Sequence, residues 1–280
     1  MCNRRGWWYV TSVFGFILVG LIHFPDSSSC QGEIPDLVTD RPDQTESSVV
    51  VPPGYFQLEM GWTHSENDDD GEDFESDTLP EALLRIGISP GWELRLGAPV
   101  HNWEDIDFDD GSPSSDEEGW GDMDVGVKKY LWAECGMCPE AAILAHLSIP
   151  TGEGGFSSER ADPSFRLSLS HTLSDRLSVG YNLGAAWETV EDSLGDRDTG
   201  SVFQYTTAVG YSVTDRLGMY VELFGDIPMS ADGTPANSFN GGFTYLVSDN
   251  FQLDVLSGVG LSDAADDWFV GAGVSYRWPR

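Results

Sequence analysis

Charged residues recur at every second position of otherwise apolar stretches, which would place them together on one side of an extended chain. Arg85 stands between Leu84 and Ile86, and Glu93 and Arg95 follow the same alternation. Rings of charge inside a pore sort solutes by their charge, whereas charges on neighbouring strands also pair simply to fill a narrow barrel. Both interpretations fit, and the candidate pore-lining residues are Glu59, Arg85, Glu93, Arg95, Asp122, Asp124, Lys128, Arg166, Glu188, Glu222, Asp254 and Arg277.

The elements that would position these charges are strands with a period of two. About twelve stretches between residues 54 and 278 alternate apolar with polar residues. In the first stretch, Phe56 and Leu58 share one face while Gln57 and Glu59 share the other. This pattern is typical of a strand with one apolar and one polar side.

The connections between these stretches alternate in length. Short turns such as residues 89–91 alternate with long acidic stretches such as 65–77 and 101–120, which are expected to be outer loops. A soluble β-sandwich also alternates faces, but aromatic residues near strand ends favour a membrane barrel. The predicted fold is all-β: a transmembrane antiparallel up-and-down β-barrel of about twelve strands over residues 54–280, with both termini periplasmic.

The chain is strongly acidic, with 47 Asp and Glu against 14 Lys and Arg, a net charge of −33 and a pI near 4.1. This balance excludes nucleic acid as a partner, because binding phosphates requires a basic surface. Residues 66–77 and 104–118 hold eight acidic residues each. Residues 68–73 offer oxygen ligands for calcium, but they lack the EF-hand spacing, and a solvated, disordered charge run is the expected state.

The first thirty residues are typical of an export signal. Arg4 and Arg5 precede an apolar stretch over residues 6–24, and small residues follow at 27–29. A membrane-spanning helix is the alternative, and Cys30 is a weak candidate for lipidation. We expect residues 1–30 to be a signal peptide and the mature chain to lie in the outer membrane of a Gram-negative-type cell, in contact with its lipid.

Residues 31–53 form a polar lead-in with too little apolar surface to fold alone. The lumen predicted beside this segment offers Arg85, Arg95, Arg166 and Arg277 as partners for carboxylates. We therefore expect residues 39–48 to fold back into the periplasmic end of the barrel as a plug, and a free tail is the alternative. The candidate plug residues are Asp40, Arg41, Asp43 and Glu46.

Cys135 and Cys138 bracket a Gly-Met pair. In an oxidising periplasm this spacing suits a small disulfide across a turn, while free thiols and a metal or redox site stay open as alternatives. His146 and Ser148 share a strand face, but a catalytic triad is defined by geometry. We expect no enzymatic activity, no catalytic or metal-binding residue and no cofactor.

The sequence also resembles a known bacterial family. The stretch TDRPDQTESS at Thr39–Ser48, followed by VVPPGYFQLE at residues 50–59, is similar to the start of the family called "putative MetA-pathway of phenol degradation". Residues 121–130 (GDMDVGVKKY) resemble its central Gly-Asp strand, and Pro150-Thr151-Gly152 resembles a loop start. The resemblance covers about residues 37–280 and implies an outer-membrane channel, linked in some members to uptake of aromatic compounds.

Two classes of function remain. The first is an outer-membrane channel for passive uptake of small solutes, with aromatic compounds as candidates. The second is a non-transporting barrel with a structural or surface-adhesion role carried by its acidic stretches. An open lumen would favour the first class, and a plugged lumen would favour gating or the second. The sequence identifies neither the solute nor the oligomeric state.

Overall fold

The computed structural model describes residues 35–69, 72–108, 112–191, 197–229 and 233–280. The predicted signal peptide and Cys30 lie outside the described residues. The described chain forms one antiparallel sheet of fifteen strands, and β15 pairs with β1 to close it. Among the described residues, no helix has the length and apolar character needed to cross a membrane.

Twelve of the fifteen strands form a closed ring, since the sheet order runs from β15 down to β7, then β4, β3 and β1, with β1 returning to β15. The closing pair runs in register from Tyr55 opposite Pro279 to Glu66 opposite Trp268. Closure leaves the ring without a free strand edge, so its backbone groups can pair between neighbouring strands, as a membrane requires. The ring strands are β1 (Tyr55–Asp69), β3 (Leu83–Ser89), β4 (Trp92–Gly97), β7 (Met123–Trp132), β8 (Glu140–Ile149), β9 (Asp162–Ser174), β10 (Leu177–Glu191), β11 (Arg197–Ser212), β12 (Leu217–Pro228), β13 (Ala236–Ser248), β14 (Phe251–Gly260) and β15 (Trp268–Pro279).

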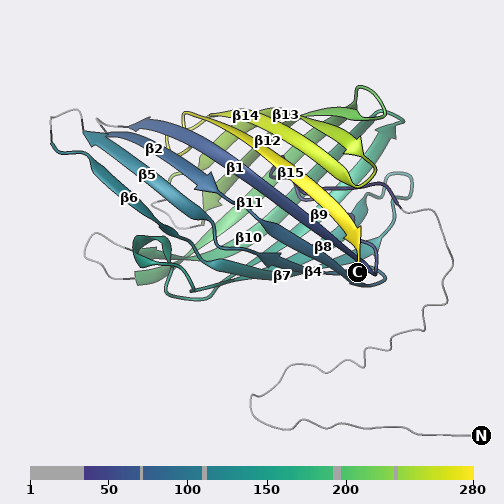
Figure 1. The fold of residues 1–280 in the computed structure, drawn as a ribbon, viewed down its shortest axis with the longest axis horizontal. Helices are drawn as coiled ribbons and strands as arrows, with labels where there is room; N and C mark the ends of the chain where they lie inside the picture. The colour runs from purple at the N-terminus through teal and green to yellow at the C-terminus, as the bar shows by residue number, and fades with distance from the viewer. Residues whose placement is uncertain (1–34, 70–71, 109–111, 192–196, 230–232) are drawn as a thin grey trace, which may run out of the picture. The chain divides into compact units, whose positions relative to one another are not determined.

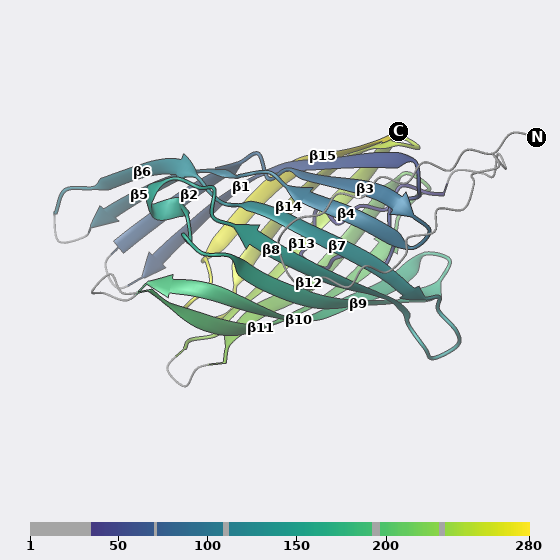
Figure 2. The same ribbon diagram turned by 90° about the horizontal axis from the view of Figure 1, so that it is seen from below.

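The remaining strands, β2 (Glu72–Leu79), β5 (His101–Phe108) and β6 (Ser115–Trp120), extend the sheet from the outer half of β1. They project beyond the rest of the barrel at one end (Figures 1 and 2). This acidic extension corrects the expectation that residues 65–77 and 101–120 are loops. The described part of the 68–73 run is also strand, because Asp68 pairs with Asp73.

The acidic extension forms because the backbone ladder of the barrel continues through short breaks. Glu81 N donates to Gly61 O at 2.9 Å, Ala98 N to Ala82 O at 2.8 Å, and Gly121 N to Val100 O at 2.8 Å. Asp and Glu are poor strand formers, but both faces of the extension are wet, so no apolar pattern is required. The charge pattern therefore identified solvent exposure correctly and secondary structure wrongly.

The two faces of the ring are inverted relative to a soluble protein, as the alternation predicted. Polar side chains such as Gln57, Asn182 and Glu222 are each 1% exposed, whereas Phe165 is 49% and Phe243 50% exposed. Apolar side chains therefore coat the outside and polar ones fill the inside, the arrangement of a membrane barrel.

Aromatic side chains gather at the two edges of the exposed apolar band. Toward the acidic extension lie Trp62, Trp103, Trp120, Trp187 and Trp268, and toward the short turns lie Trp92, Trp132, Tyr211, Tyr245 and Tyr276, all of them 36–50% exposed. Such girdles mark the two membrane–water interfaces. Because outer-membrane barrels have short periplasmic turns and longer outer connections, we expect the short turns to face the periplasm and the acidic extension to face outward.

The orientation can be tested by labelling single cysteines on intact cells. In a Cys135→Ser/Cys138→Ser background, a membrane-impermeant maleimide should label Glu118→Cys, which is exposed on β6. It should not label Asp175→Cys in the turn between β9 and β10, which is exposed on the opposite side. Equal labelling of the two variants on intact cells would contradict the orientation.

Candidate functional site

An irregular segment, residues 35–53, lies inside the ring and contributes no strand to it. It enters at the barrel end where the C-terminus lies (Figure 1). Arg277 on β15 holds its start, donating from Nη2 to Pro35 O at 2.7 Å and from Nη1 to Asp36 O at 3.0 Å. Val51 N donates to Glu93 Oε2 at 2.7 Å near its end. We call residues 39–48 within it the lumenal segment.

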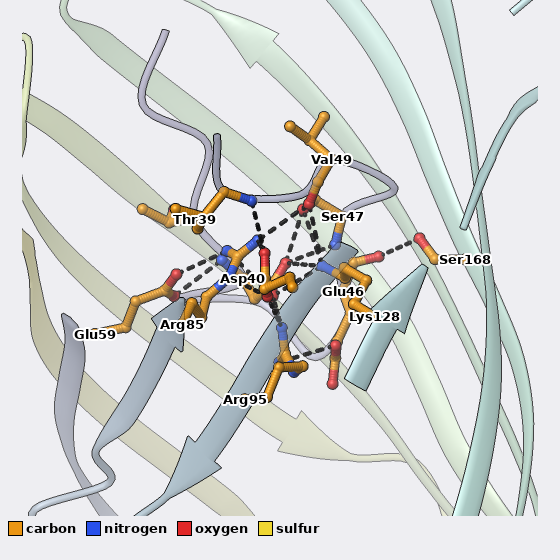
Figure 3. Close-up of polar contacts among 12 residues, drawn as sticks. Thr39, Asp40, Glu46, Ser47, Val49, Glu59, Arg85, Arg95, Lys128 and Ser168 are labelled. Carbon is orange, nitrogen blue, oxygen red and sulfur yellow. Dashed lines mark hydrogen bonds and ion pairs between the residues drawn. The ribbon is translucent and has the colours of Figure 1, made fainter. Parts of the chain in front are cut away.

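The centre of the lumenal segment is Asp40, which lies among three wall cations (Figure 3). Its Oδ2 is 3.1 Å from Arg85 Nη1, 2.6 Å from Arg95 Nη1 and 3.0 Å from Lys128 Nζ. The three cations are at most 2% exposed and come from β3, β4 and β7. An uncompensated charge in such a place is costly, so each cation here depends on a carboxylate partner. We call these three side chains the cation cage.

Two wall carboxylates complete the charge pattern around the cation cage. Glu93 binds Arg85 Nε at 2.8 Å and Arg95 Nη1 at 2.9 Å. Glu59 binds Arg85 Nη1 at 2.8 Å, and its other oxygen accepts the backbone amides of Asp40 at 2.9 Å and Arg41 at 3.0 Å. The wall carboxylates therefore orient the cations and also fix the backbone of the lumenal segment.

The second half of the lumenal segment crosses to the opposite wall. Gln44 N and Thr45 Oγ1 donate to Glu222 at 2.9 and 2.6 Å. Glu46 O accepts from Ser168 Oγ at 2.6 Å and Asn182 Nδ2 at 3.0 Å. The carboxylate of Glu46 reaches Arg95 Nη2 at 3.0 Å and Arg166 Nη1 at 3.4 Å. At its end Ser48 Oγ lies 2.6 Å from Glu140 Oε1 and 2.8 Å from Ser170 Oγ.

Glycines in the barrel wall leave space for the irregular segment, residues 35–53. A Cβ on Gly61 or Gly273 would fall within 3 Å of the Arg41 guanidinium, and one on Gly87 would lie 2.0 Å from Pro52 O. Arg41 uses the space to reach Glu81 Oε2 at 2.7 Å and Asp254 Oδ1 at 3.4 Å. The barrel wall is thus shaped to admit the segment.

Cavities lie on both sides of the lumenal segment. Arg41, Pro42 and Asp43 line a cavity of about 310 Å³ on the outer side, together with Thr63 and Arg166. The same three residues line one of about 270 Å³ on the periplasmic side. Farther out, cavities of about 330 and 680 Å³ continue toward the acidic extension. The lumenal segment therefore separates spaces that otherwise lie in series along the barrel.

A comparison with protein-family models identifies the family of the chain. The model described as "Putative MetA-pathway of phenol degradation" matches residues 39–278, which include the lumenal segment. The chain belongs to this family. The sequence resemblance is thereby confirmed.

Solved structures agree with this barrel fold. The COG4313 outer membrane channel from Pseudomonas putida F1 has 14% sequence identity and a TM-score of 0.62, covering 82% of this chain and 97% of that one. The beta domain of the Bordetella autotransporter BrkA has 12% identity and a TM-score of 0.53, covering 80% and 100%. No curated protein matches the sequence. The likenesses show the fold, which together with the exposed apolar band is that of an outer-membrane β-barrel.

Three of the predicted pore-lining residues lie away from the lumenal segment. Asp122 precedes β7 and accepts bonds from Gly152 N at 2.8 Å, Ser157 Oγ at 2.9 Å and Ser158 N at 3.0 Å, so it pins an outer loop. Asp124 lies 2.6 Å from His146 Nδ1. Glu188 is exposed near Asp162 and Asp226. These three do not join the cation cage.

Several contacts of the lumenal segment could not be expected from charge alone. Glu59 and Glu222 accept backbone amides, and Ser168, Asn182 and Glu140 bind neutral groups of the segment. The available signal is the buried Asn or Ser on a polar strand face, which must have a hydrogen-bond partner somewhere. The sequence does not say that the partner is a main-chain group.

Cys135 and Cys138 face one another in the turn between β7 and β8, where each backbone amide donates to the other residue's carbonyl at 2.9 and 3.0 Å. Both are exposed free cysteines in this structure, so the disulfide stays a prediction. Within the described ranges, no three His, Cys, Asp or Glu side chains are grouped to hold a metal ion.

The outer mouth of the barrel is strongly acidic. Its cavity of about 680 Å³ is lined by Glu66, Asp68, Asp105, Asp116 and Asp267, among others. Asp105 opposes Asp116 across β5 and β6. Their side-chain hydrogen bond raises the pKa of Asp105, and the neighbouring charges add to this effect. Asp105 therefore loses its negative charge at a higher pH than an ordinary aspartate.

Weakening one anchor should expose the lumenal segment to protease. Glu59→Gln keeps the shape of the side chain but removes the carboxylate charge that pairs with Arg85 of the cation cage, and breaking a buried ion pair costs about 3–5 kcal/mol. Because cleavage follows the population of the open form, proteinase K should cut within residues 39–48 at least about tenfold faster than in wild type. N-terminal sequencing of the fragments locates the cut.

Glu188→Gln provides the matched control, because it neutralises a lumen-side glutamate outside the cation cage. Its digestion rate should equal that of wild type. If Glu59→Gln digests no faster than Glu188→Gln, then Glu59 does not anchor the segment.

Proposed function

We propose that this barrel is an outer-membrane channel for passive uptake of small solutes, and that the lumenal segment constricts it near the periplasmic end. The observation that carries the proposal is the series of cavities interrupted by the lumenal segment. Cavities of about 310 and 270 Å³ share Arg41, Pro42 and Asp43 as a common wall. Displacing those residues would join the two spaces into one path.

Small aromatic compounds are the solutes that we propose. The outer-side cavity of about 330 Å³ contacts Phe224, Ala265 and Phe269. The two phenylalanine rings lie edge to face, with centroids 6.2 Å apart. An apolar ledge inside a polar lumen suits a ligand that carries both a ring and a polar group. The family description, which names phenol degradation, supports the same class.

A filled lumen would also suit a barrel with a purely structural or adhesive role. The chemistry of the contacts favours a removable constriction instead. The lumenal segment is held by hydrogen bonds and ion pairs to Glu222, Asn182 and the cation cage, and not by a tight apolar core. Water and solute can replace polar contacts one by one, so such a segment can leave without unfolding the ring.

Removing the lumenal segment should open the channel. A variant in which residues 39–48 are replaced by a Gly-Ser linker of equal length keeps the chain connected but removes the wall contacts. In planar bilayers its single-channel conductance should exceed that of wild type several-fold, because the spaces on either side become continuous.

A linker of the same composition placed at residues 112–114, the described part of the outer connection between β5 and β6, is the control and should leave conductance unchanged. Equal conductance of wild type and the lumenal variant would argue against a constriction. If neither protein conducts at all, the channel proposal itself fails.

The acidic mouth should make wild-type current weakly cation-selective. Carboxylates around the outer cavity raise the local cation concentration, so the reversal potential in a KCl gradient should favour K⁺. Asp105→Asn/Asp107→Asn/Asp116→Asn should reduce this preference. Higher salt should also reduce the cation preference, since exposed charges are screened over about 10 Å at 0.1 M. Acid should reduce it as well, because the raised pKa of Asp105 lets this carboxylate become neutral at a higher pH than an ordinary aspartate. Anion selectivity of wild type would contradict the prediction.

A further inference from the structure

The cation cage has the geometry of a carboxylate-binding site whose ligand is supplied by the chain itself. Asp40 Oδ2 lies within 3.1 Å of nitrogen atoms from all three cage residues. The cations belong to strands of the barrel wall, whereas Asp40 belongs to a segment that pairs with no strand (Figure 3). The receptor and its built-in ligand therefore come from separate parts of the fold.

The charge balance of the ion-pair network around Asp40 indicates that this receptor needs anions. The wall side of this network contains four cations, namely Arg85, Arg95, Lys128 and Arg166, and two carboxylates, Glu59 and Glu93, for a net charge of 4 − 2 = +2. The carboxylates of Glu222 and Glu140 lie outside this network, because they accept hydrogen bonds from neutral groups of the lumenal segment. Asp40 and Glu46 supply the two missing negative charges. Arg41 does not alter this balance, because it pairs elsewhere with Glu81 and Asp254.

The cage also keeps an unused donor. Arg95 is 2% exposed, and within the described residues its Nε is buried without a hydrogen-bond acceptor. A guanidinium binds a carboxylate best through two parallel bonds. Asp40 contacts Arg95 through Nη1, so it does not exhaust what Arg95 can offer to a freely placed carboxylate.

The apolar ledge lies next to this site. Gln44, Thr63 and Glu81 line both the cavity that contains Arg95 and the cavity that contains Phe224 and Phe269. A ligand with a ring on the ledge side and a negative group toward the cage would match both surfaces. The ring alone would find no partner for the cations.

We propose that the cation cage binds the carboxylate of a small aromatic acid, which takes the place of Asp40. This inference rests on the proposed channel function and specifies its solute. Such an acid and Asp40 compete for the same nitrogen atoms, so binding of the acid releases the centre of the lumenal segment. A neutral aromatic compound lacks the charge to do this.

The test measures binding of sodium benzoate to the purified full-length barrel by isothermal titration calorimetry. Asp40→Ala removes the built-in competitor and should bind one benzoate per chain, at least tenfold more tightly than wild type. Benzyl alcohol, of similar shape but neutral, should not bind. In the Asp40→Ala background, Lys128→Met should abolish benzoate binding while heat-modifiable migration on gels verifies that the barrel is folded.

Two further variants keep the result decisive. Asp40→Asn preserves the shape of the side chain and replaces Asp40→Ala if that variant fails to fold. It should bind benzoate with the affinity predicted for Asp40→Ala. Asp36→Ala removes an exposed carboxylate of the same irregular segment, which lines neither the cavity that contains Arg95 nor the one that contains the two phenylalanines, and it should leave benzoate affinity at the wild-type value. Equal affinity for benzoate and benzyl alcohol, or no benzoate binding by either Asp40 variant, would overturn the proposal.

Bilayer recordings separate this inference from the channel function on which it rests. If Asp40→Ala conducts more than wild type but binds no benzoate, the carboxylate site is wrong and the constricted channel stands. If Asp40→Ala and the linker variant both fail to conduct, the channel function is wrong, and the site loses its role in uptake.

Discussion

The carboxylate of Asp40 lies between Arg85, Arg95 and Lys128 at a depth where water does not reach the cations, which are at most 2% exposed. Charge in such surroundings must be paired, and leaving one cation bare costs more than forming the pair gains. Glu93 on β4 and Glu59 on β1 pair with these cations, but within this ion-pair network they leave the wall side positive. The path of the lumenal segment through the barrel follows from this requirement, because its two cage-facing carboxylates complete the balance.

The same constraint explains why the barrel interior is full and still suited to transport. An apolar plug would be held by packing and would expose apolar surface on leaving. The lumenal segment is held by hydrogen bonds and ion pairs, each of which water or a solute can replace. Wall glycines at Gly61, Gly87 and Gly273 leave space for the chain, and cavities remain on both of its sides. A tight fit in one layer of the lumen therefore coexists with open space above and below.

Much of this architecture is encoded in period-two alternation, so the strand faces could be predicted from residues such as Phe165 outward and Asn182 inward. The pairing of Arg85, Arg95 and Arg166 with carboxylates of residues 39–48 was also within reach, since both sets are charged and neighbouring in the predicted topology. Arg277 differs from this prediction, because it binds main-chain carbonyls of Pro35 and Asp36. The acidic extension was not, because Asp68 and Asp73 carry no apolar signal and their strand pairing is propagated from the barrel ladder. The hydrogen bonds to Glu59 and Glu222 could not be predicted either. Their donors are main-chain amides, which every residue except proline has, so no residue type marks them in the sequence.

The most direct test of the central claim is a cross-link between the lumenal segment and the far wall. Thr45 Oγ1 and Thr206 Oγ1 lie 2.7 Å apart, with Thr206 on β11. In a background without Cys135 and Cys138, Thr45→Cys/Thr206→Cys should form a disulfide on oxidation and hold single-channel conductance at its lowest level, and a reductant should restore wild-type openings. Failure of the pair to cross-link in the folded barrel, or equal conductance of the oxidised and reduced forms, would contradict a segment that constricts the lumen.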